Sequence, residues 1–221
     1  PGDAEESFKA GADALNLAWK FRTPVIVLLD KILSEHMMTS DIEKLTQPSL
    51  KATAGEEDLK IPGMPGKIVK VTSYEHDENG FTIDKPEDVK KMIEKRFKKL
   101  EEIKKEMQNA ETFKVFGDAE SEDMVVFFGS TKSAVLEASK YLKKPTKLLQ
   151  ILWLEPFDTE NIKRELENKK RIICVEGNHN GQLASLIREK TGIEIKDKIL
   201  KYDSMPFDPI ELAEEINKIW N

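Results

Sequence analysis

Two polar loops carry most of the side chains with which this chain could do chemistry. The first reads Glu-Gly-Asn-His-Asn-Gly-Gln from Glu176 to Gln182, between a β-rich run and a helical pattern. Ligands bind at the carboxyl ends of strands in open α/β sheets, so a ligand or a partner could bind here. Asparagine and histidine are also ordinary turn residues, and a loop without a ligand explains the same pattern. The candidate residues for an interface or anion cleft in this loop are Glu176, Asn178, His179, Asn180 and Gly181.

The second loop places four ionisable side chains in a row, namely Glu75, His76, Asp77 and Glu78. An Asn-Gly dipeptide follows, which is typical of tight turns. A structured loop could use His76 for proton transfer or hydrogen bonding, because imidazole titrates near neutral pH. An exposed turn explains the same residues, and neither loop specifies a reaction.

A third candidate is the turn Gly129, Ser130 and Thr131, which leads into a helical pattern beginning at Lys132. Backbone N–H groups and hydroxyls at a helix N-terminus suit an anion. The alternative is that Ser130 or Thr131 only caps the helix. No G-x-G occurs in the chain, and Lys132 does not follow a glycine. The dinucleotide-binding and Walker A motifs are therefore absent.

Residues for covalent or metal chemistry are scarce. Ser130 lacks the G-x-S-x-G context of a nucleophile elbow, and Cys174 lies inside an apolar run that predicts an inert, buried thiol. The three histidines have no partner at metal-ligand spacing, and a single cysteine cannot hold an iron–sulfur cluster. We therefore predict no catalytic, cofactor-binding or metal-ligating residue in this chain by itself.

The composition excludes several partners. The 221 residues include 35 basic and 41 acidic side chains, for a net charge of -6, which argues against nucleic acid. No apolar run approaches the roughly 18 residues of a membrane-spanning helix. The opening Pro1-Gly2-Asp3 has neither the basic nor the apolar region of a signal peptide. We expect a cytoplasmic protein without a membrane partner.

Residues 1–45 look like the last helix–strand unit of an upstream domain. Asp3 and Glu6 predict a capping box at the start of a helix, which Pro24 ends. Val25–Leu29 is continuously apolar and predicts a strand that is buried on both faces of a parallel sheet. One helix and one strand cannot build such a sheet. Either the chain is a fragment, or this unit completes another sheet and is exposed without it.

Residues 46–117 are predicted to be a connector. Proline and glycine interrupt its first part, a short strand is expected at Ile68–Thr72, and Pro86 to about Asn109 reads as a long, solvated, charged helix.

Residues 118–221 alternate strand and helix, which predicts an α/β domain with a doubly wound, mostly parallel sheet. The expected strands are residues 124–128, 147–153, 171–176 and 195–202, and the expected helices are 132–142, 156–169, 182–190 and 209–220. The first and third strands can be neighbours in such a sheet. That order would bring the turn at Gly129–Lys132 and the loop at Glu176–Gln182 to one edge.

The order of short motifs resembles the alpha subunit of 2-oxoacid:ferredoxin oxidoreductases, the 2-oxoglutarate and pyruvate synthase family, in its C-terminal part. The segments that carry the resemblance are Gly2–Glu6, Ala14–Ala18, Thr23–Leu28 with Asp30, Glu75–Glu78 with Gly80, Met92, Lys95-Arg96, Lys99-Leu100, Gly129–Thr131, Pro156-Phe157, Glu176, Asn180–Leu183 and Pro206-Phe207. The family usually has Gly-Arg where Ser204-Met205 stand here. The resemblance extends over essentially the whole chain.

This resemblance implies the end of a thiamine pyrimidine-type domain followed by a transketolase C-terminal-like domain. It implies a hetero-oligomer that decarboxylates a 2-oxoacid, such as 2-oxoglutarate or pyruvate, to an acyl-CoA, with ferredoxin as electron acceptor. Thiamine diphosphate, magnesium and an iron–sulfur cluster would belong to the assembled enzyme, with a beta subunit carrying the diphosphate-binding domain. This chain would then supply structural and interface elements.

Two alternatives remain open. A non-catalytic α/β assembly or regulatory module could bind an anion at Gly129–Lys132. Another thiamine enzyme, of the transketolase or branched-chain dehydrogenase type, fits less well because the Glu75–Glu78 segment resembles the ferredoxin-linked group.

Overall fold

A computed structural model describes residues 1–40, 62–66, 69–70 and 72–221. The chain forms two compact units. One comprises Pro1–Ala12, Ile26–Pro48 and Glu111–Asn221, and the other comprises Asp13–Val25 and Ser49–Ala110. The predicted strand at Ile68–Thr72 lies partly outside the described residues, as does much of the predicted connector.

The first unit contains a five-stranded sheet in the order β1-β3-β2-β4-β5. Its strands are β1 (Phe113–Gly117), β2 (Asp123–Phe128), β3 (Lys147–Ile151), β4 (Arg171–Glu176) and β5 (Asp197–Leu200). All neighbours are parallel except β1, which pairs antiparallel with β3. The continuous apolar runs of β2 and β3 follow from this position, because central parallel strands are covered on both faces.

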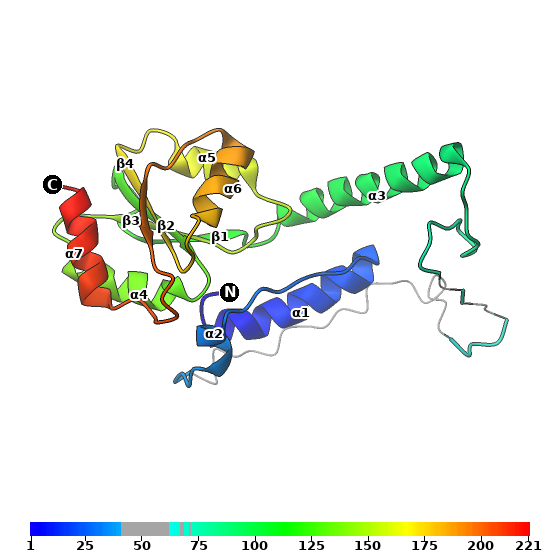
Figure 1. Ribbon diagram of the computed structural model, residues 1–221, viewed down its shortest axis with the longest axis horizontal. Helices are drawn as coiled ribbons and strands as arrows, with labels where there is room; N and C mark the ends of the chain where they lie inside the picture. Colours follow the sequence, from blue (N-terminus) through cyan, green and yellow to red (C-terminus); the bar gives the residue numbers. More distant parts are fainter. Residues whose placement is uncertain (41–61, 67–68, 71) are drawn as a thin grey trace. The chain divides into compact units, whose positions relative to one another are not determined.

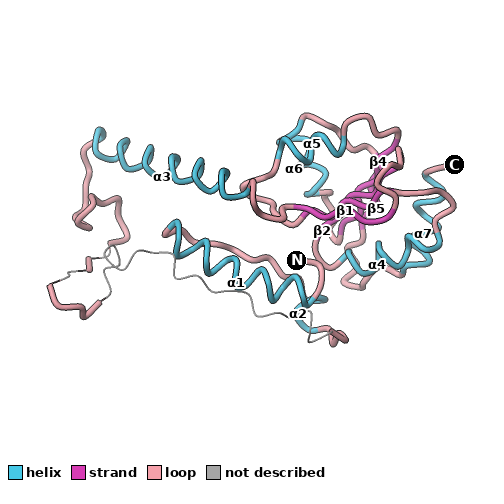
Figure 2. The backbone as a smooth tube through the Cα atoms, turned by 180° about the vertical axis from the view of Figure 1, so that it is seen from behind, coloured by secondary structure: helices cyan, strands magenta, loops and turns pink. Residues whose placement is uncertain are grey.

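Helices cover both faces of this sheet (Figures 1 and 2). On one face, α4 (Thr131–Ala138) and α7 (Pro209–Ile219) pack over Val125 and Phe127. On the other, α5 (Thr159–Leu166) and α6 (Gln182–Thr191) pack over Met124 and Val126. Alternate residues of β2 thus pack into two separate hydrophobic cores, one on each face of the sheet, which is the arrangement of a doubly wound α/β fold. The predicted fold class is confirmed.

The N-terminal helix α1 (Ala4–Phe21) starts where the sequence predicts. The Asp3 carboxylate caps it by accepting a hydrogen bond from the Glu6 N–H at 2.8 Å. In a capping box, the Glu6 side chain would accept a hydrogen bond from the Asp3 backbone N–H, and this bond is not the one found. The Glu6 side chain accepts from Gly2 N and reaches across to other elements.

Val25–Leu29 is not a strand, so the prediction of a strand buried on both faces is wrong for this chain. Ile26 is 81% exposed and Leu28 64%, because no strand among the described residues pairs with the segment. The alternative expectation, an exposed segment, is confirmed. The short helix α2 (Lys31–Glu35) follows, capped by Asp30.

The second unit contains α3 (Pro86–Met107), which confirms the predicted charged helix. Only Met107 of this helix is buried. Near its end, the Glu106 carboxylate pairs with the Lys20 ammonium of α1 at 2.6 Å.

Two further differences concern element ends in the first unit. Strand β1 lies within residues 46–117, where no strand was expected at that point, because Lys114 and Gly117 interrupt its apolar pattern. The expected helix at 132–142 stops at Ala138 and continues as a tighter turn over Ser139–Tyr141. Helix α6 ends at Gly192, whose φ of 78° is typical of a glycine that ends a helix.

Candidate functional site

The turn after β2 and the loop after β4 lie at the same edge of the sheet. Strands β2 and β4 are parallel neighbours, with Phe127 opposite Val175. The chain goes from β2 to β3 on one side, then crosses back past β2 to β4 on the other. The two segments therefore flank the topological switch point, where doubly wound proteins place their ligands.

The turn at Gly129–Lys132 is shaped by its backbone. Gly129 has a φ of 62°, a left-handed conformation that glycine adopts without strain. The Thr131 hydroxyl donates to the carbonyl oxygen of Phe128 at 2.6 Å, and Ser130 occupies the N-cap without a side-chain capping bond. Thr131 thus braces the turn, and Lys132 supplies the positive charge.

The Lys132 ammonium is already paired with carboxylates from α1 and its cap. It bonds to the Asp3 carboxylate and to Glu6 Oε1, the latter at 2.6 Å. Glu6 is 8% exposed and also accepts from the Lys114 ammonium at 2.9 Å and from Gln150 Nε2 at 2.7 Å. We name these residues, Asp3, Glu6, Lys114, Lys132 and Gln150, the Glu6 cluster.

The Glu6 cluster stabilises a buried negative charge. Burial by itself would raise the pKa of the Glu6 carboxyl group, because it disfavours the charged form. Hydrogen bonds from Lys132, Lys114, Gly2 and Gln150 outweigh burial and lower this pKa to about 2. Glu6 is therefore ionised at any physiological pH.

Gly2 lies against the turn at Gly129–Lys132. A Cβ atom on Gly2 would come within 2.6 Å of Lys132 Cβ and 2.8 Å of the Gly129 carbonyl oxygen. The chain's own first residues therefore cover the turn that the sequence singles out as an anion position.

The loop after β4 also satisfies its own helix N-terminus. Glu176 is fully buried, and its carboxylate accepts from the backbone N–H groups of Leu183 at 2.7 Å and Ala184 at 3.0 Å. Asn178 donates to the same carboxylate at 2.8 Å, and its side-chain oxygen accepts from Gly181 N at 2.9 Å. The first amides of α6 thus bind a carboxylate of the same chain.

His179 and Asn180 of this loop are both exposed. His179 Nδ1 lies 2.8 Å from Asn180 Oδ1, and the His179 ring meets the Tyr202 ring edge-on with centroids 4.6 Å apart.

Cys174, on β4, is buried beside Glu176. Burial, and then the nearby Glu176 carboxylate, raise the pKa of the Cys174 thiol well above its ordinary value, as expected for an unreactive thiol.

In the second unit, the Glu75–Glu78 loop is a structured turn held by α3. Both carboxylate oxygens of Glu75 accept from the Arg96 guanidinium at 2.6 Å, and this pairing holds the pKa of Glu75 below its usual range. The Asp77 carboxylate accepts from the N–H groups of Asn79 and Phe81. His76 Nδ1 lies 3.1 Å from the Tyr74 carbonyl oxygen and donates to it.

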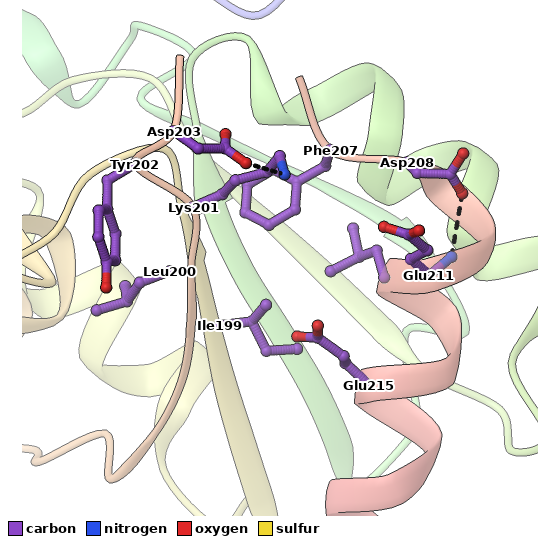
Figure 3. Close-up of a pocket in the computed structure, with 10 residues that line it drawn as sticks. Ile199, Leu200, Lys201, Tyr202, Asp203, Phe207, Asp208, Glu211 and Glu215 are labelled. Carbon is purple, nitrogen blue, oxygen red and sulfur yellow. Dashed lines mark hydrogen bonds and ion pairs between the residues drawn. The ribbon is translucent and has the colours of Figure 1, made fainter. Parts of the chain in front are cut away.

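A shallow cavity of about 250 Å³ lies beside the carboxyl end of β5 (Figure 3). Ile199 and Leu212 belong to its apolar lining. Lys201 pairs with Asp203 at 2.7 Å, and the Glu211 and Glu215 side chains extend from α7 toward β5. The sequence did not single out this cavity.

The sequence analysis also missed the Glu6 cluster, except for Lys132 and the predicted capping box of Asp3 and Glu6. Lys114 and Gln150 lie inside strands, and they face each other only because β1 runs antiparallel to β3. The buried polar Gln150 in an apolar run was the one available signal.

Comparison with known proteins identifies the family. Residues 1–112 match the model described as pyruvate flavodoxin/ferredoxin oxidoreductase, thiamine diP-bdg. The chain belongs to this family. The resemblance predicted from short motifs is confirmed.

Relatives of this oxidoreductase family match nearly the whole chain. The 2-oxoacid:ferredoxin oxidoreductase subunit alpha of Saccharolobus solfataricus is 36% identical over 240 residues, covering 99% of this chain and 38% of the relative. Subunit alpha of 2-oxoacid:ferredoxin oxidoreductase 2 of Aeropyrum pernix is 32% identical over 238 residues, with 99% and 37% covered. The chain therefore spans less than two fifths of the length of these relatives.

A solved structure has the same fold. The 2-oxoglutarate:ferredoxin oxidoreductase from Magnetococcus marinus, with 2-oxoglutarate, coenzyme A and succinyl-CoA bound, matches with a TM-score of 0.79. The match covers 99% of this chain and 41% of that chain at 24% identity, so it supports the fold alone. Among the described residues, no helix is both long and apolar enough to cross a membrane.

Proposed function

We propose that this chain forms part of the alpha subunit of a cytoplasmic 2-oxoacid:ferredoxin oxidoreductase. The whole enzyme would oxidatively decarboxylate a 2-oxoacid, such as 2-oxoglutarate or pyruvate, and form an acyl-CoA with ferredoxin as electron acceptor. The observation that carries the proposal is the 36% identity to a curated alpha subunit along 99% of the chain.

The cofactors of such an enzyme do not fit the described residues of this chain alone. The sequence has a single cysteine, which is buried, so it cannot hold an iron–sulfur cluster. Among the described residues, no three His, Cys, Asp or Glu side chains converge as a metal site. The two helix-opening turns at the sheet edge already face Glu6 and Glu176. We therefore assign magnesium and the cluster to a partner, and we propose that the beta subunit supplies the diphosphate-binding domain for thiamine diphosphate, whose family model this chain matches over residues 1–112.

The role that remains for this chain is to build and position an interface. The residues from Gly129 to Thr131 and from Glu176 to Gly181 shape the edge of the sheet, and Glu75–Glu78 forms a hydrogen-bonded turn beside α3. We propose that both features meet partner subunits. An anion-binding regulatory module has less support, because carboxylates of the chain itself lie at both predicted anion positions.

The test is reconstitution. The full-length alpha subunit that contains this sequence is co-expressed with its beta subunit, and ferredoxin or viologen reduction is measured with CoA and different 2-oxoacids. We expect reduction that depends on both a 2-oxoacid and CoA. A pure, cofactor-loaded complex that reduces neither acceptor with any 2-oxoacid would contradict the proposal.

A further inference from the structure

Glu6 is held in the way that a protein holds a carboxylate ligand. Its Oε1 accepts from the ammonium groups of Lys132 at 2.6 Å and Lys114 at 2.9 Å. Its Oε2 accepts from Gln150 Nε2 at 2.7 Å and from Gly2 N at 2.7 Å. A carboxylate can accept about four hydrogen bonds, and here both oxygens are fully used.

Three of the four donors belong to elements distant from Glu6 in the sequence. Lys114 comes from β1, Gln150 from β3 and Lys132 from the first turn of α4. Lys114 and Gln150 are paired in register, so the sheet itself sets their spacing. The backbone positions of Lys114 and Gln150 are therefore set independently of Glu6.

Without the Glu6 carboxylate, the donors of the cluster cannot replace their lost hydrogen bonds by bonding to one another. Gln150 is completely buried, and the side chain of Lys132 is 10% exposed. Without Glu6, the Gln150 N–H loses its acceptor, and Lys132 keeps only Asp3. An unpaired buried donor is costly, so the emptied site should favour an anion of the right size.

We propose that β1, β3 and α4 form a carboxylate-binding site, and that Glu6 of α1 is its built-in ligand. The site is selective for a small monocarboxylate, because its donors converge on two oxygens. By binding the Glu6 side chain, the site holds the first turn of α1 against the sheet. This inference does not depend on the enzymatic activity.

The test is chemical rescue of Glu6→Ala in the full 221-residue chain. Acetate has the heavy atoms that the truncation removes, and acetamide is its neutral counterpart of equal shape. We expect acetate to raise the midpoint of thermal unfolding of Glu6→Ala by roughly 3–6 °C at about ten times its dissociation constant. The effect should saturate, and acetamide should not reproduce it.

Three further chains serve as controls. Glu6→Gln fills the site with an amide, so acetate should shift it no more than the wild type. Glu6→Ala/Lys132→Met lacks the central ammonium and should lose the response. Glu106→Ala removes a half-exposed carboxylate that pairs with Lys20 and should show no rescue.

If Glu6→Ala does not fold alone, acetate should restore its yield of folded protein during refolding, again more than acetamide. The proposal is overturned if acetate and acetamide act alike on Glu6→Ala. It is also overturned if acetate acts equally on Glu6→Ala and Glu106→Ala, or if folding is not restored.

Discussion

At Glu6, hydrogen bonds outweigh the cost of burying a charge. The folding stability of the chain should therefore depend on pH. The pKa of Glu6 is about 2 in the folded chain and 4.5 as its ordinary value, so the folded state binds this proton more weakly than the unfolded state. The charged groups that face Glu6 include Lys114, Lys132, Asp3 and the α-amino group of Pro1.

Glu6 should therefore contribute stability that is complete above about pH 5 and is lost as the pH falls from 4.5 toward 2. Urea unfolding at pH 7 and at pH 3 measures this loss. We expect the wild type to lose more free energy of unfolding between these pH values than Glu6→Gln does. Equal losses would contradict the assignment of the low pKa to Glu6.

The fit of Gly2 against the turn at Gly129–Lys132 is a second property of a single residue. Gly2→Ala should destabilise the chain by about 1–3 kcal/mol, the usual cost of overpacking, because the new Cβ would lie 2.6 Å from Lys132 Cβ. The matched control is Gly11→Ala, which meets nothing within 4 Å inside helix α1. Gly11→Ala should stabilise the helix by about 0.5–1 kcal/mol. Chemical denaturation of both variants checks the opposite signs, and a neutral Gly2→Ala would rule out the close contact.

Among the helices and strands, those that pack against other elements of this chain could be predicted from the sequence. Strand β4 has the predicted bounds, and α6 and α7 end or begin at the predicted cap residues Gly192 and Asp208. Both kinds of signal are local, since apolar runs and caps act within a few residues. The antiparallel pairing of β1 with β3 is not local, and so neither β1 nor the Glu6 cluster could be predicted.

Val25–Leu29 shows the opposite case, in which a local apolar pattern is not matched by a strand among the described residues. Its sequence has the apolar content of a central strand, yet it is exposed here. In the complete alpha–beta complex, we expect the backbone amides of Val25–Leu29 to exchange hydrogen at least tenfold more slowly than in the isolated chain, because strand pairing protects them. Hydrogen exchange with mass spectrometry measures both states. Equal rates would show that no sheet forms around this segment.

For the molecule as a whole, we expect the isolated chain to lack 2-oxoacid oxidation activity and to carry no iron. Its only cysteine is buried, and no metal-binding cluster is present among the described residues. Purified chain supplied with thiamine diphosphate, magnesium, CoA and a 2-oxoacid should not reduce viologen, while the reconstituted complex should. Viologen reduction by the chain alone would contradict the assignment of the cofactors to a partner.

The exposed run Val25–Leu29 also has a consequence for handling the chain outside its complex. Five consecutive uncharged, largely β-branched and exposed residues are the sequence type that seeds intermolecular cross-β pairing. Pro24 before the run and Asp30 after it act as gatekeepers, because proline cannot continue a strand ladder and a charge resists stacking. The chain made without its partners should therefore aggregate through this segment, and a charged substitution at Ile26 should keep it in solution.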